Sequence, residues 1–550
     1  MEKNVLLFME EKTSELESNI ALGMKSNLGW KELTFKGLSI LSKRLANYLV
    51  ELGIDKGSNV AILSESMPEW GAALFATVMA GATAIPLDIK LTYYELTSIL
   101  SDCKPRIMLV SSAYLSTAMK LKETITSIEE IILIDDNGAN KDYNSIYTLE
   151  DKPERKWRHR ATNKTAFVIY TSGTTGNPKG VEISFDNIIS QVEAVGNAFH
   201  LGPQDRLLSI LPMNHLFELT VGFLSFLSMG TSIYYSKSLK PADLFPIFQD
   251  KKITFMVVVP AFLKLLKSSI ENEISKACPG KRAIFKLMYK IAEIIPSYRL
   301  RRFMFGNIHK KFGGKFKGFI SGGAPLDVNV GKFLQTIGLK VFEGYGLSEA
   351  SPVVSVNVEG ASKLGSVGKP LFNVKARIDK ETGELQVYGK NIMKGYYNKP
   401  ELTREVMTDD GWLKTGDIAK IDDEGFIWIT GRLKNMIVLA GGKKVFPEEV
   451  ESVIEKSQMV QEVCVYGSKR ESGQKEGSED ITAVIVPRQN ILDEYSDDNE
   501  LAKVIKSEVK VLSEQLSSFK RPTNVIVIRE PLPKTATNKV KRKEIVNIGK

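Results

Sequence analysis

Hydrophobic residues follow two alternating periods over residues 36–150. Leu38, Leu41 and Leu45 recur at the spacing of one helix face. Short apolar runs with the length of buried strands lie at 58–63, 83–86, 106–110 and 130–135, and helices are expected at 69–81 and 94–102. Strands that alternate with helices in this way predict parallel sheets covered by helices.

The same pattern continues to Gly431 and then changes. Further strands are expected at 166–169, 253–259, 316–321 and 339–342. Beyond Gly431 the pattern predicts a helix at 448–456, strands at 460–466 and 481–486, a polar loop at 469–480, a helix at 500–519 and a strand at 524–528. We therefore predict an α/β fold: a large N-terminal domain (1–431) of helix-covered, mainly parallel sheets, and a small α+β C-terminal domain (432–550).

Length and composition agree with two domains and restrict the class of protein. A chain of 550 residues is too long for one core, and 43% apolar with 25% charged residues is typical of soluble globular proteins. Cys103, Cys278 and Cys464 form no CxxC pair, and only four histidines occur, which disfavours disulfide, zinc and histidine-based metal sites. The apolar run Val5 to Met9 is too short for a secretion signal, and no apolar stretch reaches the roughly 18 residues of a membrane span. We expect a cytoplasmic protein.

Positive charge is concentrated in residues 281–317. This segment holds eleven Lys and Arg but only one acid, Glu293, giving a net charge of +10 in a chain of net charge +9. Large apolar residues alternate with these charges. The pattern is typical of a basic amphipathic segment on an anionic bilayer, and equally of a solvated helix pair packed on its domain. Nucleic-acid binding is not expected, because no known binding motif accompanies the charge.

The run from Tyr170 to Gly180 follows an apolar strand and precedes a helix start at Ser184. Its glycines free the backbone to turn N–H groups toward an anion, and four hydroxyls and Lys179 add donors. The run is not a Walker A loop, because Asn177 and Pro178 separate Gly176 from the lysine. It predicts a polyphosphate-binding loop; a flexible surface loop is the alternative.

Three later motifs carry suitable chemistry for a nucleotide. In Gly344–Pro352, Glu349 offers a hard oxygen ligand for Mg²⁺, and Tyr345 offers a flat face for a purine. The turn at 321–326 lets the backbone approach a ligand, or is a simple strand-to-helix turn. In Gly411–Asp417, the carboxylate can accept two hydroxyl groups.

In this order, the motifs resemble those of the AMP-forming adenylating enzymes, which include acyl- and aryl-CoA synthetases, peptide-synthetase adenylation domains and luciferases. The resemblance runs from about residue 30 to Lys543. It implies a large N-terminal domain and a small mobile C-terminal domain that meet near Arg432. It also implies ATP, Mg²⁺ and coenzyme A as cofactor and co-substrates.

The resemblance assigns the nucleotide-binding residues. Those expected at the phosphates are Thr171, Ser172, Gly173, Thr174, Thr175, Gly176 and Lys179. The expected Mg²⁺ ligands are Glu349 and Thr175. Those expected at the adenine and the acyl pocket are Gly323, Ala324 and Tyr345, whereas Asp417 and Arg432 are expected at the ribose and α-phosphate.

The resemblance also assigns residues to the successive steps of the reaction. His215 aligns with a gate near the carboxylate, and the apolar stretch that follows it to Gly230 is a buried helix, a wall of an acyl tunnel, or both. Lys434 stands at the hinge, and Lys539 at the place of a catalytic lysine, preceded by Asn538 where the family usually has glycine. Gly441 belongs to a loop that meets pantetheine, although Lys443 and Lys444 replace a commoner Glu-Asn there.

The segment before residue 321 and the run 344–357 look most like the long-chain branch of this family. The implied function is ATP-dependent activation of a medium- to long-chain fatty acid to acyl-AMP, followed by transfer to CoA. The alternatives are loading of an acyl carrier protein, activation of aryl or short-chain acids, and a catalytically silent nucleotide-binding or membrane-surface protein. If residues 281–317 bind lipid, the protein contacts the inner face of the membrane peripherally.

Overall fold

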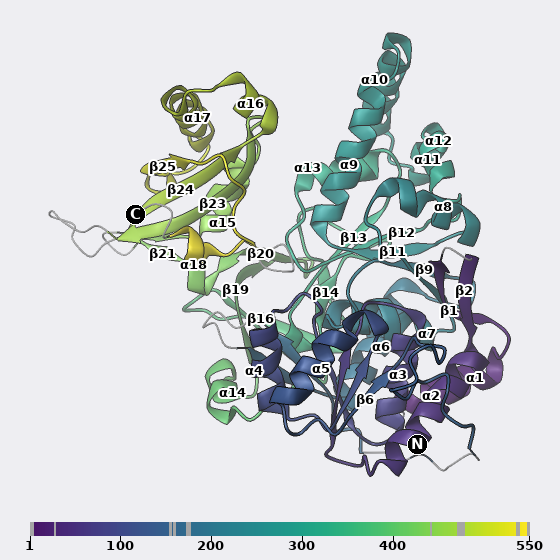
Figure 1. The fold of residues 1–550 in the computed structure, drawn as a ribbon. Helices are drawn as coiled ribbons and strands as arrows, with labels where there is room; N and C mark the ends of the chain where they lie inside the picture. The colour runs from purple at the N-terminus through teal and green to yellow at the C-terminus, as the bar shows by residue number, and fades with distance from the viewer. Residues whose placement is uncertain are drawn as a thin grey trace. The chain divides into compact units, whose positions relative to one another are not determined.

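The predicted alternation of strands and helices over residues 36–150 is confirmed in the computed structural model (Figure 1). Four short, almost wholly buried strands lie here as parallel neighbours. In sheet order they are β4 (Thr83–Pro86), β3 (Asn59–Leu63), β5 (Ile107–Val110) and β6 (Glu130–Leu133). The accompanying helices are α2 (Phe35–Glu51), α3 (Pro68–Met79), α4 (Tyr93–Cys103) and α5 (Leu115–Thr124).

The structure describes residues 5–26, 29–152, 157, 161–171, 178–439, 443–469, 479–534 and 540–546. The chain forms two units. Unit 1 comprises Met1–Ala376, Val387–Leu413 and Asp423–Ile427, and unit 2 comprises Arg377–Gln386, Lys414–Asp422 and Trp428–Lys550. The smaller unit thus contains the whole of the predicted C-terminal domain together with two short earlier segments; the boundary near Arg432 stays a prediction.

A seven-stranded sheet of unit 1 extends the four parallel strands with a hairpin and a short edge strand. The added strands are β7 (Thr165–Thr171), β8 (Lys179–Ser184) and β18 (Gly395–Tyr396). β7 continues the parallel sheet beside β4, whereas β8 and β18 are antiparallel to their neighbours. The predicted helix start at Ser184 is confirmed. Its side chain accepts from the N–H of Asn187, whose side chain accepts in return from the N–H of Ser184, at the start of α6 (Phe185–Phe199).

A nine-stranded sheet forms the second half of unit 1. In sheet order its strands are β15 (Lys369–Pro370), β14 (Val353–Val356), β13 (Val341–Gly346), β12 (Gly318–Ser321), β11 (Phe255–Val258), β9 (Arg206–Ser209), β10 (Ser232–Tyr235), β1 (Ile20–Ser26) and β2 (Gly29–Thr34). The strands from β13 to β1 are parallel, and antiparallel strands close both edges. The mainly parallel architecture is confirmed.

Helices follow most strands of this second sheet. They are α1 (Val5–Glu15), a π-helix η2 (Glu218–Ser225), α7 (Phe226–Ser228), α8 (Pro241–Lys251), α9 (Pro260–Ser275), α10 (Pro279–Ile294), α11 (Tyr298–Met304), α12 (Gly306–Lys311) and α13 (Val328–Thr336). Among them, α8, α9, α10 and α13 share an apolar core with β11, β12 and β13, in which Phe312, Phe316 and Phe319 are in ring contact. Among the described residues, no helix is long and apolar enough to cross a bilayer.

A four-stranded sheet links segments of both units along the chain, in the order β16 (Val374–Ile378), β17 (Glu384–Gly389), β19 (Leu413–Ile421) and β20 (Ile427–Arg432). Unit 2 adds the pair β21 (Ile437–Val438) and β22 (Lys444–Val445), and a three-stranded sheet of β23 (Val460–Lys469), β24 (Glu479–Pro487) and β25 (Asn524–Val527). Its helices are α15 (Pro447–Ile454), α16 (Gln489–Glu494), α17 (Asp498–Ser513) and α18 (Arg542–Ile545). Unit 1 also contains α14 (Pro400–Val406).

Two predictions for unit 2 are wrong in extent. The helix expected to reach residue 519 ends at Ser513, because the Arg521 guanidinium donates to the carbonyls of Glu514 and Leu516, which a continuing helix would use itself. The ends of the loop expected at 469–480 belong to strands instead, because the antiparallel ladder of β23 and β24 continues to the pair Lys469 and Glu479.

Candidate functional site

Three of the predicted motifs follow parallel strands of the nine-stranded sheet. β9, β12 and β13 all run in the same direction, with β11 between β9 and β12. The segment containing His215 follows β9, the turn with Gly323 follows β12, and Tyr345 lies near the end of β13. Loops after parallel strands share one edge of a sheet, which is where α/β proteins bind ligands. The fold therefore brings these three motifs to one edge.

The turn after β12 presents its backbone to solvent. Gly323 has φ +83°, a conformation that favours glycine, and both Gly323 and Ala324 are exposed. The preceding glycine, Gly322, allows a close approach, because a Cβ there would lie 3.0 Å from the ring of Phe217. The turn therefore exposes its main chain at Gly323 and Ala324, and the adenine contact stays a prediction.

Glu343 supports this turn and was not identified from the sequence. Its Oε1 accepts from the N–H of Leu326 at 3.0 Å, which ties the turn after β12 to β13. Burial raises the pKa of Glu343 to about 7. A carboxylate directly after the predicted strand 339–342 was the available signal, but a strand pattern alone does not show which loop that carboxylate contacts.

Glu349, the predicted Mg²⁺ ligand, is held beside the predicted phosphate-binding lysine. The hydroxyl of Tyr396 donates to Glu349 Oε1 at 2.8 Å, and Lys179 Nζ lies 5.2 Å from the centre of the Tyr396 ring. The backbone carbonyl of Glu349 accepts from the N–H of Met393 at 2.9 Å. Burial and the neighbouring carboxylate raise the pKa of Tyr396 well above its usual range, so the phenol stays a donor.

Tyr396 is a site residue that the sequence interpretation missed. It lies on β18, which pairs with β8 so that Tyr396 faces Val181 in register, two residues from Lys179. The signal was the aromatic pair in Gly395-Tyr396-Tyr397, between the Glu349 and Asp417 motifs. The contact of Tyr396 with Lys179 depends on the pairing of β18 with β8, which are more than 200 residues apart in the sequence.

The predicted phosphate loop joins two paired strands. Thr171 at the end of β7 pairs with Lys179 at the start of β8, so the ladder fixes both ends of the loop. Thr171 and Lys179 are therefore neighbours, as the phosphate-binding assignment requires. The residues Ser172, Gly173, Thr174, Thr175 and Gly176 lie outside the described residues, as do Gly441 and Lys539.

His215 stands between β9 and a buried helix. It is about one third exposed, and its Nε2 lies 3.7 Å from Asp88 Oδ2. Its carbonyl accepts from the N–H of Leu219 at the start of η2. Every residue of η2 and α7 is buried, which confirms a buried helix for the apolar stretch; the tunnel wall stays a prediction.

The buried helix also carries a carboxyl group, Glu218, that the sequence interpretation did not single out. Glu218 is fully buried, and its Oε1 accepts from Ser209 Oγ at 2.5 Å. Oε2 has no hydrogen-bond partner among the described residues. Gly222 makes room for it, because a Cβ there would lie 2.5 Å from Oε1. Burial raises the pKa of Glu218 to about 8.

In unit 2, the two residues predicted at the ribose and α-phosphate contact each other. Arg432 Nε donates to Asp417 Oδ1 at 2.7 Å; the carboxylate is nearly fully buried and the guanidinium is half-exposed. The neighbouring Gly416 donates its N–H to Glu384 Oε1 at 2.7 Å. Because Asp417 belongs to unit 2 and Tyr345 to unit 1, a shared nucleotide stays a prediction.

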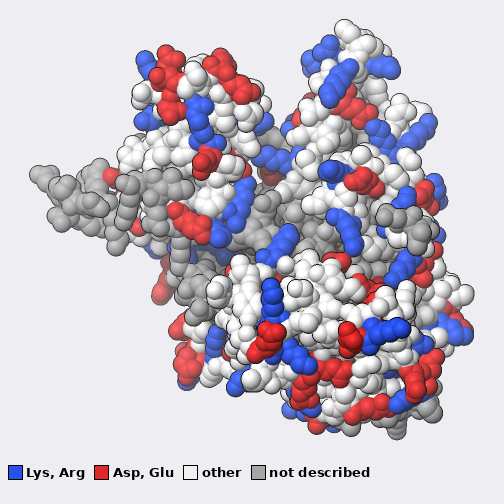
Figure 2. All heavy atoms as spheres, in the orientation of Figure 1, with Lys and Arg blue, Asp and Glu red and all other residues white. Residues whose placement is uncertain are grey.

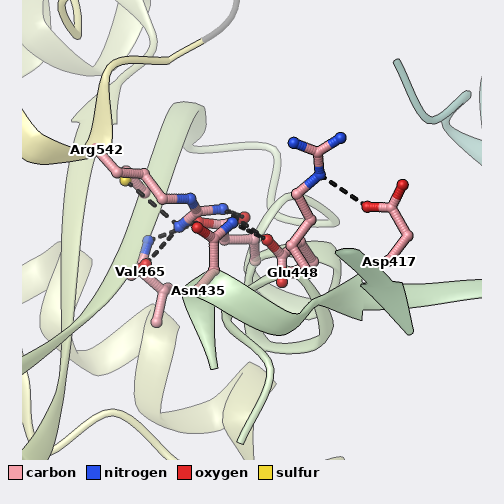
Figure 3. A network of polar contacts seen from close by, with 8 residues as sticks. Asp417, Asn435, Glu448, Val465 and Arg542 are labelled. Carbon is pink, nitrogen blue, oxygen red and sulfur yellow. Dashed lines mark hydrogen bonds and ion pairs between the residues drawn. The ribbon is translucent and has the colours of Figure 1, made fainter. Parts of the chain in front are cut away.

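In unit 2, a polar network holds Arg542, which lies on the C-terminal side of residues 535–539 (Figure 3). Arg542 forms two hydrogen bonds with the carboxylate of Glu451, at 2.6 and 2.7 Å, and contacts Glu448 at 3.4 Å. Glu448 also accepts from Asn435, the neighbour of the exposed hinge candidate Lys434. On the other side, Lys534 Nζ donates to Glu462 at 2.6 Å. Lys534 and Arg542, which flank residues 535–539 in the sequence, are therefore both held by ion pairs.

The metal prediction rests on Glu349 within the described part of the chain. No group of three or more His, Cys, Asp and Glu side chains suited to a metal ion occurs among the residues that the structure describes. A single carboxylate is nonetheless an ordinary protein contribution to Mg²⁺ bound by phosphate oxygens. The donor set fits such an ion only if a nucleotide supplies the remaining ligands.

Comparison with known proteins identifies the family. Residues 10–397 match the AMP-binding enzyme family, and residues 449–539 match the AMP-binding enzyme C-terminal domain. The chain belongs to the AMP-binding enzyme family. The resemblance inferred from the motifs is thereby confirmed, and the two matched regions of this AMP-binding enzyme follow the order expected for a larger and a smaller domain.

Relatives of this AMP-binding enzyme include long-chain-fatty-acid–CoA ligases. FadD15 of Mycobacterium tuberculosis (strain ATCC 25618 / H37Rv) is 30% identical over 464 residues, which cover 80% of this chain and 76% of FadD15. FadD13 of the same strain is 27% identical over 530 residues, covering 92% of this chain and 91% of FadD13. The chain is thus most like the fatty acid branch of the adenylating enzymes.

Solved structures confirm the fold. ATP-bound MatB from Rhodopseudomonas palustris superposes with a TM-score of 0.79 at 26% identity, and the match covers 99% of both chains. A Mycobacterium tuberculosis fatty acyl CoA synthetase gives a TM-score of 0.71 at 24% identity, over 99% of this chain and 98% of that one. Both support the α/β class with a smaller C-terminal domain.

Proposed function

We propose that the protein activates a medium- to long-chain fatty acid with ATP to form acyl-AMP and pyrophosphate, and then transfers the acyl group to CoA. The observation that carries this proposal is the contact of Lys179, Tyr396 and Glu349 in a chain of the AMP-binding enzyme family. It joins a cation for phosphate oxygens to a carboxylate suited to a metal–phosphate complex. The fatty acid class is supported by the long-chain-fatty-acid–CoA ligases among the relatives.

In the first half-reaction, an oxygen of the fatty acid carboxylate attacks the α-phosphorus of ATP, and the bond to pyrophosphate breaks. Lys179, adjacent to the phosphate loop, neutralises charge on the phosphate oxygens, and Tyr396 holds Glu349 through its hydroxyl. We assign Lys539 to the charge that develops during this attack. Fixed cations of this kind act by preorganisation, because they are in place before the charge forms.

Mg²⁺ is part of the proposal, with Glu349 and Thr175 as its protein ligands. When bound, the ion neutralises phosphate charge and orients the leaving pyrophosphate. The carboxylate of Glu349 is oriented by its contact with Tyr396 before any ion arrives. We expect activity to require Mg²⁺ and to fall when a chelator removes it.

In the second half-reaction, the thiol sulfur of CoA attacks the acyl carbonyl carbon and loses its proton. The carbonyl–oxygen bond to AMP breaks, and the thioester and AMP leave. We assign Gly441 to the path of the pantetheine arm and Lys434 to the hinge between the two reaction states. The exposed position of Lys434 on the turn η4 (Leu433–Asn435) agrees with a role that needs backbone rotation.

Pyrophosphate release tests the proposal. The protein is incubated with ATP, Mg²⁺ and fatty acids of graded chain length, with and without CoA. We expect release that depends on a medium- or long-chain acid, and acyl-CoA only when CoA is present. No release with any acid of the series would overturn the proposal.

The same assay separates the alternatives. If holo acyl carrier protein accepts the acyl group and CoA does not, the enzyme is a carrier-protein ligase. If aryl or short-chain acids are turned over far better than fatty acids, the proposed fatty acid substrate class is wrong, although the proposed acyl-AMP-forming reaction is right.

A further inference from the structure

Helix α10 carries two apolar stripes, and only one of them packs against the protein. Phe285, Met288 and Tyr289 pack on the apolar core of unit 1, together with the buried Ala292. A surface helix normally has a single stripe of this kind, with polar residues opposite. The second stripe of α10 consists of Ile284, Leu287, Ile291 and Ile294, which are 40–81% exposed.

The exposed stripe has helical spacing and continues into the next helix. Its members are separated by three, four and three residues, so that they lie on one face of α10. After the short connection Ile295–Ser297, α11 exposes Leu300 and Phe303, the latter to 85%. Single exposed apolar residues are ordinary, but a run of six on consecutive helices marks an interaction surface.

Positively charged side chains lie on the same two helices as this stripe and form no ion pairs with the described residues of the fold. On α10 and α11, five exposed cations have no ion pair within the described residues: Lys281, Arg282, Lys286, Lys290 and Arg299. Figure 2 shows Lys and Arg side chains around uncharged atoms at the end of α10 that projects from unit 1. The surface thus combines unpaired positive charge with exposed hydrocarbon.

Other cations of residues 281–317 are structural instead. Arg301 donates to the carbonyl of Ile295 at 2.8 Å, and Arg302 donates to the carbonyls of Phe316 and Gly314 at 2.7 and 2.6 Å. Lys311 and Lys317 form ion pairs with acids outside the segment. The segment therefore contains both cations that contact the rest of unit 1 and cations that face outward on α10 and α11. Arg301 and Arg302 are unsuitable for testing a surface.

We propose that the exposed face of α10 and α11 docks the protein on an anionic lipid bilayer. A bilayer offers anionic head groups for the lysines and, just beneath, a hydrocarbon boundary for the isoleucines and Phe303. Charge complementarity selects anionic lipid over a second copy of this chain, whose α10 would bring the same positive charge. The benefit of docking rests on the proposed function, because long-chain fatty acids partition into membranes.

Co-sedimentation with vesicles tests the docking. The probes are vesicles of phosphatidylcholine alone and vesicles of phosphatidylcholine mixed with phosphatidylglycerol, each at low and high salt. We expect binding to the mixed vesicles at low salt and weaker binding at high salt, because salt screens exposed charges. Absence of binding to mixed vesicles at low salt would overturn the proposal.

A matched pair of triple variants assigns the binding to α10. Lys281→Glu, Lys286→Glu and Lys290→Glu reverse three charges on α10. The control, Lys503→Glu, Lys506→Glu and Lys510→Glu, makes the same change of net charge on exposed positions of α17 in unit 2. The α10 variant should lose at least about 100-fold in apparent affinity for mixed vesicles, from about 1 kcal/mol for each cation. An equal loss in the control would show unspecific attraction and overturn the proposal.

The double variant Ile294→Ser and Phe303→Ser tests the hydrocarbon contact at unchanged charge. It should bind mixed vesicles more weakly and retain the oligomeric state of the wild type. If the wild type self-associates and this variant separates the copies, the face is an interface between two chains and the lipid proposal fails. Pyrophosphate release with a water-soluble acid, measured without vesicles, should be unchanged; failure of the wild type there counts against the proposed function alone.

Discussion

Tyr396 illustrates how one side chain can join two parts of a site. Its ring faces the Lys179 ammonium and its hydroxyl donates to Glu349, so it fixes the spacing between a cation and the carboxylate proposed to bind Mg²⁺. Neither partner constrains the other directly in the described contacts. The geometry assigns the Tyr396 hydroxyl to positioning Glu349. A substitution that removes the hydroxyl but keeps the ring separates this role from the role of the ring near Lys179.

Replacing Tyr396 with phenylalanine should raise the Mg²⁺ concentration needed for acyl-AMP formation. The ring stays near Lys179, but Glu349 loses a hydrogen bond of the charged type, worth roughly 1.5–3 kcal/mol, which corresponds to a loss of about 10- to 100-fold. Pyrophosphate release measured against Mg²⁺ concentration tests this. Tyr397→Phe is the control, because its hydroxyl contacts Asn59 instead. Equal Mg²⁺ dependence in both variants and the wild type would refute the positioning role.

Lys539 should act only in the first half-reaction. Lys539→Ala should lower acyl-AMP formation about 10²-fold or more, as expected when one preorganised charge donor is removed. The variant should still convert supplied acyl-AMP and CoA to the thioester. Lys541→Ala, two positions away, is the control and should keep both activities. Near-normal pyrophosphate release by Lys539→Ala would show that another group carries the charge.

At the scale of elements, helix α18 depends on a mostly buried ion pair. Arg542→Gln leaves the carboxylates of Glu451 and Glu448 without their cation, and breaking such a pair costs roughly 3 kcal/mol. We expect a lower urea midpoint for unfolding of the C-terminal unit. Arg529→Gln removes a more exposed pair with Asp498 and should cost less. A smaller effect at Arg542 than at Arg529 would contradict this account of the anchor.

The π-helix η2 should make stability depend on pH through Glu218. Its pKa is about 8 in the folded protein and near 4.5 when unfolded, so the folded state retains the proton longer. This contribution is fully present below about pH 4.5 and is lost as pH rises through about 8, with a slope of at most roughly 1.4 kcal/mol per pH unit. Glu218→Gln should flatten this dependence, measured by urea unfolding at several pH values. The exposed Glu123→Gln should behave as the wild type; an unchanged slope in Glu218→Gln would exclude the carboxyl as its source.

Sequence patterns predicted elements well where strands and helices differ in length and flanking residues. The short runs at 83–86 and 106–110 are strands, and the capping residues at Ser184 begin a helix. The π-helical form of 218–225 could not be predicted, because a mostly apolar, fully buried run has no clear periodicity from which to tell one helix type from another. Nor could the end of α17, which depends on Arg521 folding back on it.

At the scale of the whole molecule, the order of the motifs along the sequence predicted the family. It did not predict which side chains contact each other. The motifs around Glu349 and Asp417 were recognisable locally. The contacts of Tyr396 with Lys179 and of Glu343 with Leu326 depend on strands that pair across long stretches of sequence. Local sequence motifs therefore did not reveal the residues that support the candidate site, Tyr396 and Glu343.

Two units and two half-reactions predict that the reactions can be lost separately. Gly441→Leu adds a side chain where the pantetheine arm is expected, so it should form acyl-AMP at a normal rate and then stall before the thioester. Single-turnover assays that follow pyrophosphate and thioester in parallel measure this. If both products decline equally, Gly441 has a structural role instead.

The β7–β8 hairpin has a consequence for the order of folding. Its partners, from Thr165–Ser184 to Thr171–Lys179, are close in sequence, whereas the neighbouring parallel pair β4–β7 joins residues more than 80 positions apart. Local hairpins close within microseconds, and contacts between distant residues form later because closing the longer loop costs more chain entropy. The two ends of the phosphate loop can thus come together during synthesis, before the C-terminal unit that carries Lys539 has left the ribosome.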